Sequence, residues 1–388
     1  MPFVQKYRDF SLVTLGNFFF FCNFSSFFLL PLFIRDIGGD EARIGYVMGT
    51  FGITSIGAIP FVAFLIDHYG RRRFMLAGSF LMFLVSLLYI FISDIDVKIF
   101  LLRLMQGIAF AFFFTSAATA VSDYVPSEIR AYGLGIFGAF TIASYSIGPT
   151  IGELMIERFS YSIFFLYTSL FSLLAFILCF LSREGNFRVS EKSIFSGFFD
   201  VVFSARFRVL LLTNLIIAVG LGSMLNFFSV FLEGNGIHAW SFFLTYSVTV
   251  ILIRVLGGKL PDIVERRKIA LPSMLIMVLS LLMISSINST LSAVLVSFVF
   301  SLGYGILYPT ISAMIIDRAL DDERGTAMGA FNMSFSIGIN LFAFALGLIA
   351  RDYGFSNMYS VTGIFLLAGC IIFTYKYFIS AGRVKRLS

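Results

Sequence analysis

The stretch Ala63-Phe-Leu-Ile-Asp67-His-Tyr-Gly70-Arg71-Arg72-Arg73 is a short polar hinge between two long apolar runs. A version of it returns much later in the chain as Gly258-Lys-Leu-Pro-Asp262-Ile-Val-Glu-Arg266-Arg267-Lys268. The aspartates of the two stretches are 195 positions apart, and two other charged residues recur at a spacing of 194, Asp123 with Asp317 and Arg130 with Arg324. Three charged landmarks that repeat at nearly one spacing predict a chain made of two copies of one half.

The composition predicts a membrane protein. Hydrophobic residues make up 59% of the chain and charged residues only 13%, with a mean hydropathy of +0.94, whereas a soluble domain is about half apolar and a quarter charged. The apolar residues fall in runs of about twenty, the length that crosses a bilayer as a helix. We expect an all-α protein with twelve membrane-spanning helices, six in each half, at roughly residues 10–34, 44–66, 74–93, 98–121, 132–156, 161–182, 207–232, 241–262, 269–288, 290–316, 325–350 and 355–379.

The distribution of lysine and arginine predicts the orientation of these helices. With the N-terminus placed in the cytoplasm, twenty of the loop and terminal Lys and Arg residues lie on the inner side and five on the outer side. The positive-inside rule therefore places both termini in the cytoplasm. The net charge of +6 is explained in this way, and we expect a lipid bilayer as the partner and no nucleic acid.

The predicted domains are an N-terminal six-helix bundle at 1–182, a cytoplasmic linker at 183–206 and a C-terminal six-helix bundle at 207–388. The linker predicts an amphipathic helix in the membrane interface. Its apolar face would hold Ile194, Phe195, Phe198, Phe199, Val202 and Phe203, opposite Glu191, Lys192, Ser196 and Asp200. We interpret this segment as a tether that lets the two halves move, and the alternative is that it docks a partner protein.

Nothing in the sequence indicates an enzyme, a cofactor or a metal site. Cys22, Cys179 and Cys370 lie in apolar runs, which is typical of packed thiols. His68 and His238 lie in opposite loops and share no spacing with other ligands. The chain has no phosphate-binding G-x-x-x-x-G-K-[ST] loop, so we expect an ion gradient, such as that of protons, as the energy source.

The two hinge stretches resemble motif A of the major facilitator superfamily, G-x-L-a-D-r-x-G-R-[KR]-[KR]. The first copy keeps the aspartate, the second glycine and the basic run but has Ala63 and His68 at two places of the pattern. In that family the motif closes the cytoplasmic side. The resemblance therefore implies a latch of the outward-open state, in two copies, with the residues Asp67, Gly70, Arg71, Arg72 and Asp123 in one and Asp262, Arg266, Arg267 and Asp317 in the other.

Two further stretches carry the same resemblance. Leu102-Arg103-Leu-Met-Gln106-Gly107 is similar to motif B of the fourth span. Gly135, Ser144 and Gly148-Pro149-Thr-Ile-Gly152-Glu153 resemble motif C of the drug:proton antiporters, with Ser144 and Glu153 in two glycine places. The branch implied is that of drug:proton antiporters or arabinose-efflux-like permeases. We expect Gly148 and Pro149 to lie where the fifth span meets the other bundle.

Arg103 and Glu153 are charges that the second half does not repeat, since the offset maps them onto Ser297 and Leu348. Both would lie about 6–8 Å inside the outer membrane edge at 1.5 Å per residue. A charge within a span is a functional candidate. We expect the two to pair when the site is empty, with Glu153 as the proton carrier; the alternative is that both reach the interface as structural charges.

Polar and aromatic stripes on four spans predict the substrate cavity. The candidates are Asn17, Phe20 and Phe24 on the first span, Arg103, Gln106 and Phe110 on the fourth, Tyr304 and Tyr308 on the tenth, and Asn332, Ser336 and Asn340 on the eleventh. Residues four apart share one helix face. Interhelical hydrogen bonding explains each stripe as well as substrate contact does. The first span, as drawn from residue 10, contains no Asp or Glu.

The sequence thus predicts a secondary transporter that works by alternating access between two pseudo-symmetric bundles. We expect a monomer in a prokaryotic cytoplasmic membrane that exports an amphipathic small molecule in exchange for protons. Uptake of a small organic solute is the alternative on the same scaffold. From a different class, a membrane receptor that does not transport is the remaining hypothesis.

Overall fold

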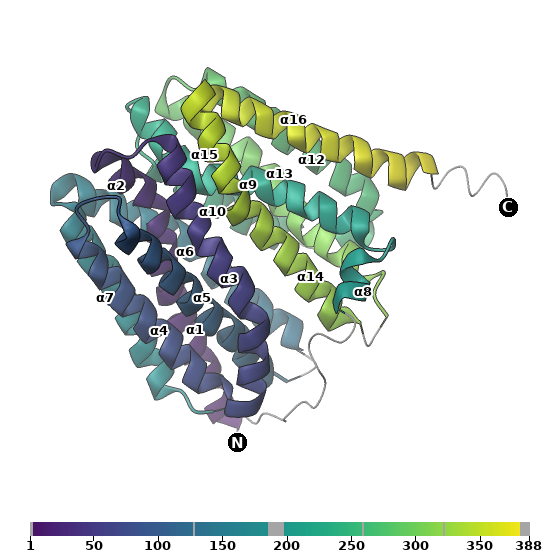
Figure 1. Ribbon diagram of the computed structural model, residues 1–388. Coiled ribbons are helices and arrows are strands. Elements are labelled where there is room, and N and C mark those ends of the chain that lie inside the picture. Colours follow the sequence, from purple (N-terminus) through teal and green to yellow (C-terminus); the bar gives the residue numbers. More distant parts are fainter. Residues whose placement is uncertain (1–2, 127–128, 185–197, 258–259, 321–322, 381–388) are drawn as a thin grey trace. The chain divides into compact units, whose positions relative to one another are not determined.

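The structure is a computed structural model, and it describes residues 3–126, 129–184, 198–257, 260–320 and 323–380. Within these ranges every regular element is a helix (Figure 1). Twelve helical segments are long and apolar enough to cross a membrane. This confirms the all-α fold with twelve spans.

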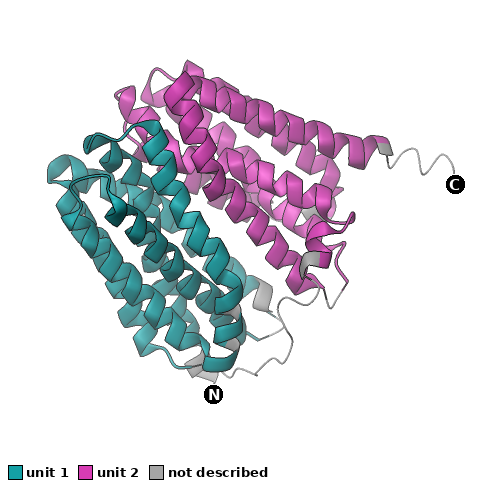
Figure 2. Cartoon of the chain, viewed as in Figure 1, with its two compact units in different colours: residues 1–192 teal, residues 193–388 magenta. Residues whose placement is uncertain are grey.

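The chain divides into two compact units, residues 1–192 and residues 193–388 (Figure 2). The spans of the first unit are built from α1 (Phe3–Ser26), η1 (Phe27–Leu29), α2 (Leu30–Asp36), α3 (Glu41–Tyr69), α4 (Arg71–Leu88), η2 (Tyr89–Phe91), α5 (Val97–Tyr124), α6 (Arg130–Arg158) and α7 (Tyr161–Leu181). The first span is therefore continuous from α1 through α2 and ends at Asp36.

The second unit begins with the short helix α8 (Phe198–Phe203). Its spans are built from α9 (Arg208–Gly234), α10 (Trp240–Gly257), α12 (Arg266–Met283), η4 (Ile284–Ser286), α13 (Thr290–Ile316), α14 (Arg324–Ser336), α15 (Phe342–Tyr353) and α16 (Phe355–Thr374). One turn, α11 (Leu260–Ile263), precedes α12, and two π-helical segments, η5 (Ile337–Leu341) and η6 (Tyr375–Ser380), follow α14 and α16.

Helix starts differ between the odd and even spans. Four even-numbered spans begin at a side chain that accepts a backbone N–H of the first turn, namely Asp40 before α3, Asp96 before α5, Ser160 before α7 and Ser289 before α13. Five odd-numbered spans instead begin at an arginine, namely α4, α6, α9, α12 and α14. A positive charge at a helix N-terminus opposes the helix dipole, so helix stability does not explain these arginines, whereas membrane topology does.

Glycines permit close helix packing inside each unit. A Cβ added at Gly107 of α5 would lie 2.2 Å from Thr54 Oγ1 of α3, and one at Gly303 of α13 would lie 2.8 Å from the Ser273 carbonyl oxygen of α12. Contacts this short exist only because the side chain is a hydrogen. A glycine thus holds the second and fourth spans closely together in the first unit, and another glycine does so for the ninth and tenth spans in the second unit.

Gly148 also makes a close approach, inside its own unit. An added Cβ would lie 2.3 Å from Ser25 Oγ and 2.4 Å from the Cys22 carbonyl oxygen, both in α1. Gly152 approaches Phe164 and Leu29. Gly148 and Gly152 therefore pack α6 against the first span of their own unit, and Gly152 also packs it against α7. That Gly148 lies where the fifth span meets the other bundle stays a prediction.

Two expected boundaries change. The first span does not begin at residue 10, since α1 starts at Phe3 and the apolar span at Tyr7, so Asp9 lies inside it. In the linker, residues 185–197 lie outside the described residues. The remainder forms only the six-residue α8, in which Val201 is buried and Phe203 is 75% exposed.

Candidate functional site

The junction of α3 and α4 holds the first hinge stretch. Gly70 takes a φ of +89° there, a conformation that glycine adopts readily. The Arg71 side chain, which is buried, forms an ion pair with Asp123 near the end of α5, with 2.9 Å between Nε and Oδ2. The structure therefore brings together Arg71 and Asp123 of the predicted latch; the side chain of Asp67 lies outside the described residues.

Glu184 completes this junction, and the sequence did not single it out. Its carboxylate accepts the backbone N–H of Arg71 at 2.7 Å and of Arg72 at 3.0 Å. A carboxylate at a helix N-terminus satisfies free N–H groups and complements the helix dipole. The chain that leaves α7 thereby caps α4, across a sequence separation of more than a hundred residues. No local pattern in the sequence predicts a cap from so far away.

The second hinge stretch repeats the ion pair. Arg266, at the start of α12, pairs with Asp317, which follows α13 directly. The Arg266 guanidinium also donates to the Ala313 carbonyl oxygen at 3.1 Å. The side chain of Asp262 lies outside the described residues. Arg71 with Asp123 and Arg266 with Asp317 are therefore equivalent pairs in the two units.

The arginine that follows each ion-paired arginine, Arg72 or Arg267, also makes equivalent contacts in the two units. Arg72 donates to the Phe180 carbonyl oxygen near the end of α7, and its guanidinium lies 5.2 Å from the centroid of the Phe180 ring. Arg267 donates to the Tyr377 carbonyl oxygen at the end of the last span and lies 5.5 Å from the Phe378 ring. Each unit therefore uses its arginine pair to join the third span of the unit to the ends of its fourth and sixth spans.

Glu265 gives the second copy an additional local acid. Its carboxylate pairs with Arg267 and Lys268. The hydrogen bond from Arg267, together with the positive charges nearby, lowers the pKa of Glu265 below its ordinary value. The carboxylate is thus ionised at neutral pH, next to the arginine that joins the ninth and twelfth spans.

Arg103 is buried in α5, with 5% of its surface exposed. Its guanidinium donates to the Val47 carbonyl oxygen at 3.2 Å, the Met48 carbonyl oxygen at 3.4 Å and Gln106 Oε1 at 3.0 Å. It also lies 5.2 Å from the centroid of the Phe51 ring. The expected pair with Glu153 is therefore not formed, because α3 and Gln106 satisfy the guanidinium.

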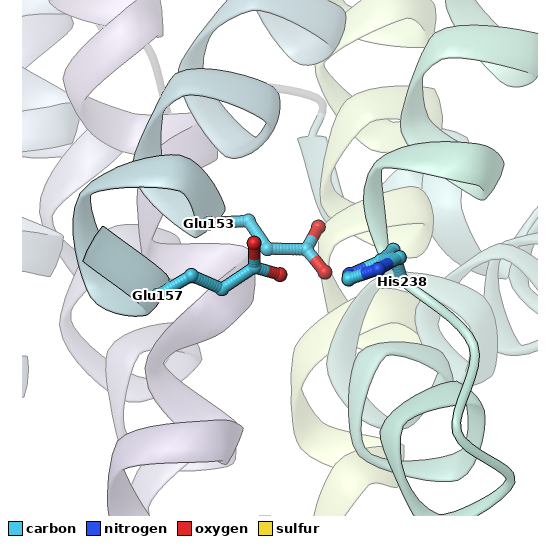
Figure 3. A group of neighbouring side chains, drawn as sticks. All are labelled: Glu153, Glu157 and His238. Atoms are coloured by element: carbon cyan, nitrogen blue, oxygen red, sulfur yellow. The ribbon is translucent and has the colours of Figure 1, made fainter.

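Glu153 is buried and Glu157 exposed, one turn apart on α6. Their carboxylate oxygens lie within 4.8 Å of each other, and Figure 3 shows both side chains on the same side of the helix. Two carboxylates this close repel each other when both are ionised. His238, also drawn in Figure 3, belongs to the loop between α9 and α10 of the other unit. Glu157 was not connected with Glu153 from the sequence.

The candidates on the first and fourth spans separate into packing residues and a shared aromatic cluster. Phe20 is fully buried and stacks on Phe113 at 3.9 Å between ring centroids, so it is a core residue. Asn17, also fully buried, donates to Thr141 Oγ1 of α6 at 2.8 Å. Phe24 and Phe110 lie together, 4.9 Å apart, next to Phe51. The cluster continues through Phe21, Phe28, Phe114 and Tyr145.

The candidates of the second unit lie on α13 and on the span built from α14, η5 and α15. Tyr304 and Tyr308 are neighbours, with ring centroids 6.0 Å apart. Asn332 is exposed, and Asn340 donates to the Ser336 carbonyl oxygen at 3.0 Å. Asn340 lies in the π-turn η5, so the spacing of four does not keep it on the face of Asn332 as a regular α-helix would.

Two charged residues within spans were missed. Asp9 is fully buried in α1, and its Oδ1 accepts the Arg183 backbone N–H at 3.3 Å. It was missed because the first span was drawn from residue 10. Arg254 lies in α10, three residues before its end at Gly257. It was overlooked although a lone arginine in an apolar run is a clear signal.

Comparison with known families and proteins identifies one family for the whole chain. The family model described as Major Facilitator Superfamily matches residues 12–262 and 236–387. An uncharacterized MFS-type transporter of Methanocaldococcus jannaschii is 22% identical over 356 residues, which cover 89% of this chain and 91% of that protein. The multi-drug resistance efflux pump PmrA of Streptococcus pneumoniae is 26% identical over 364 residues, covering 88% of this chain and 89% of the pump.

A solved structure shows the same fold. The crystal structure of a mutant of the nucleoside transporter NupG superimposes with a TM-score of 0.83 and 12% sequence identity, over 95% of this chain and all of that one. At this identity the likeness concerns the fold.

Proposed function

Since the chain belongs to the major facilitator superfamily, we propose that it exports an amphipathic small molecule in exchange for protons by alternating access. The family and the twelve spans make it a secondary transporter and a multi-pass integral protein of the cytoplasmic membrane. It is not an enzyme. The substrate class, the direction and the coupling ion are the parts that we propose.

The proposal of alternating access is supported most directly by the arginine pair that both units contain, Arg71 with Arg72 and Arg266 with Arg267. Each unit anchors Arg71 or Arg266 to the end of its fourth span and Arg72 or Arg267 to the end of its sixth. Equivalent anchors let each bundle move as one body, since the helix ends within a bundle are tied to one another. In this proposal Asp67 and Asp262 form the part of the latch that opens and closes on the cytoplasmic side.

Export is supported by the relatives and by the aromatic cluster. The PmrA relative is named as a multi-drug efflux pump. The cluster around Phe24, Phe51 and Phe110 offers ring faces rather than paired hydrogen-bonding groups. Aromatic rings bind flat apolar compounds and cations through their faces. A substrate site lined by this cluster would suit amphipathic compounds better than sugars.

Proton coupling is assigned to Glu153. A buried carboxyl group changes its solvation when it takes up or loses a proton, so its charge can bias one conformation over another. Glu153 is buried, lies on α6 and has the carboxylate of Glu157 within 4.8 Å. Asp9 is the second candidate, because it is buried at the start of the first span.

Uptake of a small organic solute is the second proposal, because the nucleoside transporter NupG has the same fold. Reconstituted protein in proteoliposomes with an imposed pH gradient distinguishes the two. Ethidium, an amphipathic cation, and uridine, a nucleoside, serve as probes. Export predicts that ethidium moves against the direction of proton flow. Once nigericin has collapsed the pH gradient, ethidium should no longer be transported. Uridine should not be transported under either condition. Gradient-driven uridine flux parallel to protons would overturn export in favour of uptake.

A further inference from the structure

Arg254 is a charged residue of the second unit that belongs neither to the repeated arginine pair nor to the proposed proton site. It lies within the apolar sequence Val248-Thr-Val-Ile-Leu-Ile-Arg254-Val-Leu of α10. The offset of 195 maps it onto Ile59, so the first half has no equivalent charge. A charge within a span is costly and is retained where it faces a functional partner.

The aromatic surroundings of Arg254 are ordered. The guanidinium carbon lies 5.9 Å from the centroid of the Tyr308 ring. Tyr308 neighbours Tyr304 at 6.0 Å, and Tyr304 neighbours Tyr246 of α10 at 5.9 Å. Arg254 therefore stands at the end of a ladder of three tyrosines that α10 and α13 share. These two helices pack against each other within the unit.

The guanidinium has no acceptor for its donors in the part of the chain that the structure describes. Its Nε is buried and makes no hydrogen bond there. Neither α10 nor α13 contains Asp or Glu, and Asp317, the acid that follows α13, pairs with Arg266. Arg103 differs in this respect, since protein oxygens accept its hydrogen bonds. A guanidinium has five N–H donors in a planar fork that fits a carboxylate with two parallel hydrogen bonds.

We propose that Arg254 and the tyrosine ladder form a subsite for the carboxylate of an amphipathic aromatic substrate. The carboxylate accepts two hydrogen bonds from the guanidinium, and the aromatic part of the substrate packs on the ring of Tyr308, which the buried Tyr304 supports. The inference rests on the proposed function in treating the ligand as a transported substrate. The binding step itself depends on neither the direction of transport nor the coupling ion.

The test uses the full-length protein in detergent and two probes that differ in one group. Dansylglycine carries an aromatic body and a carboxylate, and dansylglycinamide is its neutral counterpart. Dansylglycine is expected to raise the apparent melting temperature with the logarithm of its concentration once this exceeds the dissociation constant, and the amide to raise it far less. Arg254→Gln should weaken dansylglycine binding by on the order of ten- to a hundredfold, whereas Arg254→Lys should restore only part, because it lacks the fork.

Arg351→Gln is the matched control, since Arg351 is an exposed arginine of the same unit that pairs with Asp352; its dansylglycine binding should equal that of the wild type. Equal affinity of the wild type for acid and amide, or unchanged affinity in both Arg254 variants, would overturn the subsite.

A phosphatidylglycerol headgroup presents a similar oxyanion. If this lipid in nanodiscs displaces dansylglycine from the wild type and binds Arg254→Gln less, the site belongs to lipid and the substrate subsite is refuted. Ethidium export without any preference for the carboxylate probe would refute the subsite alone and leave the proposed function standing.

Discussion

Gly148 is the position where the packing of α6 on α1 can be tested most sharply. Replacing it with alanine places a Cβ 2.3 Å from Ser25 Oγ and 2.4 Å from the Cys22 carbonyl oxygen, where ordinary contacts are wider by about 1 Å or more. The Ser25 hydroxyl donates to the Ser144 carbonyl oxygen at 2.8 Å, and it would have to move.

The expected cost follows from these contacts. Overpacking costs about 1–3 kcal/mol, and the displaced hydrogen bond costs about 1 kcal/mol. Replacing a helical glycine with alanine returns about 0.5–1 kcal/mol. The net destabilisation of Gly148→Ala is therefore about 1–3 kcal/mol, which lowers the melting temperature by roughly 2–12 °C for a unit of about 200 residues.

The assay is thermal unfolding of the purified protein, followed by the fraction that survives heating as a monodisperse peak in size exclusion. Gly138→Ala is the matched control in the same helix, because its added Cβ meets no atom within 4 Å. It should be neutral or slightly stabilising. If Gly148→Ala melts at the same temperature as Gly138→Ala, α6 does not pack on α1 as described. Gly148→Leu should be worse than Gly148→Ala, and normal transport by it would refute the resemblance of this stretch to motif C.

Substitutions at four further positions test the roles of individual charged residues. Glu184→Gln removes the ionised cap of α4 and should destabilise the protein by about 1 kcal/mol; an unchanged melting temperature would show that the cap contributes nothing. Asp67→Asn should shift the distances between spin labels across the cytoplasmic mouth toward inward-open forms and slow transport, with Asp262→Asn having a weaker effect. Unchanged distances and flux would leave Asp67 a topology residue. Arg103→Lys should be destabilised almost as much as Arg103→Ala, since one ammonium cannot serve acceptors on α3 and Gln106 together; full stability of the lysine variant would contradict this.

Much of the fold could be predicted from the sequence, because each signal was local. Apolar runs of membrane length gave the twelve spans, and the repeated hinge stretches predicted equivalent ion pairs, of which Arg71 with Asp123 and Arg266 with Asp317 are observed. Helix ends were less accurate. Asp9 was left out of the first span since a buried carboxylate at its start interrupts the apolar run by which the span was recognised.

The candidate site was harder to predict, because it depends on which side chains meet across helices. The sequence paired Arg103 with Glu153 by depth alone, but the direction of each side chain around its helix was unknown. The guanidinium is turned to α3 and Gln106. The approach of Gly148 to α1 and the cap from Glu184 are likewise contacts between distant segments. Spacing along one helix contains no information on them.

The most direct test of the central claim, exchange of protons for an amphipathic compound through a carboxyl group, is proton movement in proteoliposomes that contain the pH dye pyranine. Addition of ethidium to wild-type vesicles under a pH gradient should move protons opposite to ethidium, with a rate that depends on pH. Glu153→Gln should abolish or flatten that dependence, while the Glu157→Gln control retains most of it. Ethidium flux without proton movement in the wild type, or the same pH profile in wild type and Glu153→Gln, would contradict the account.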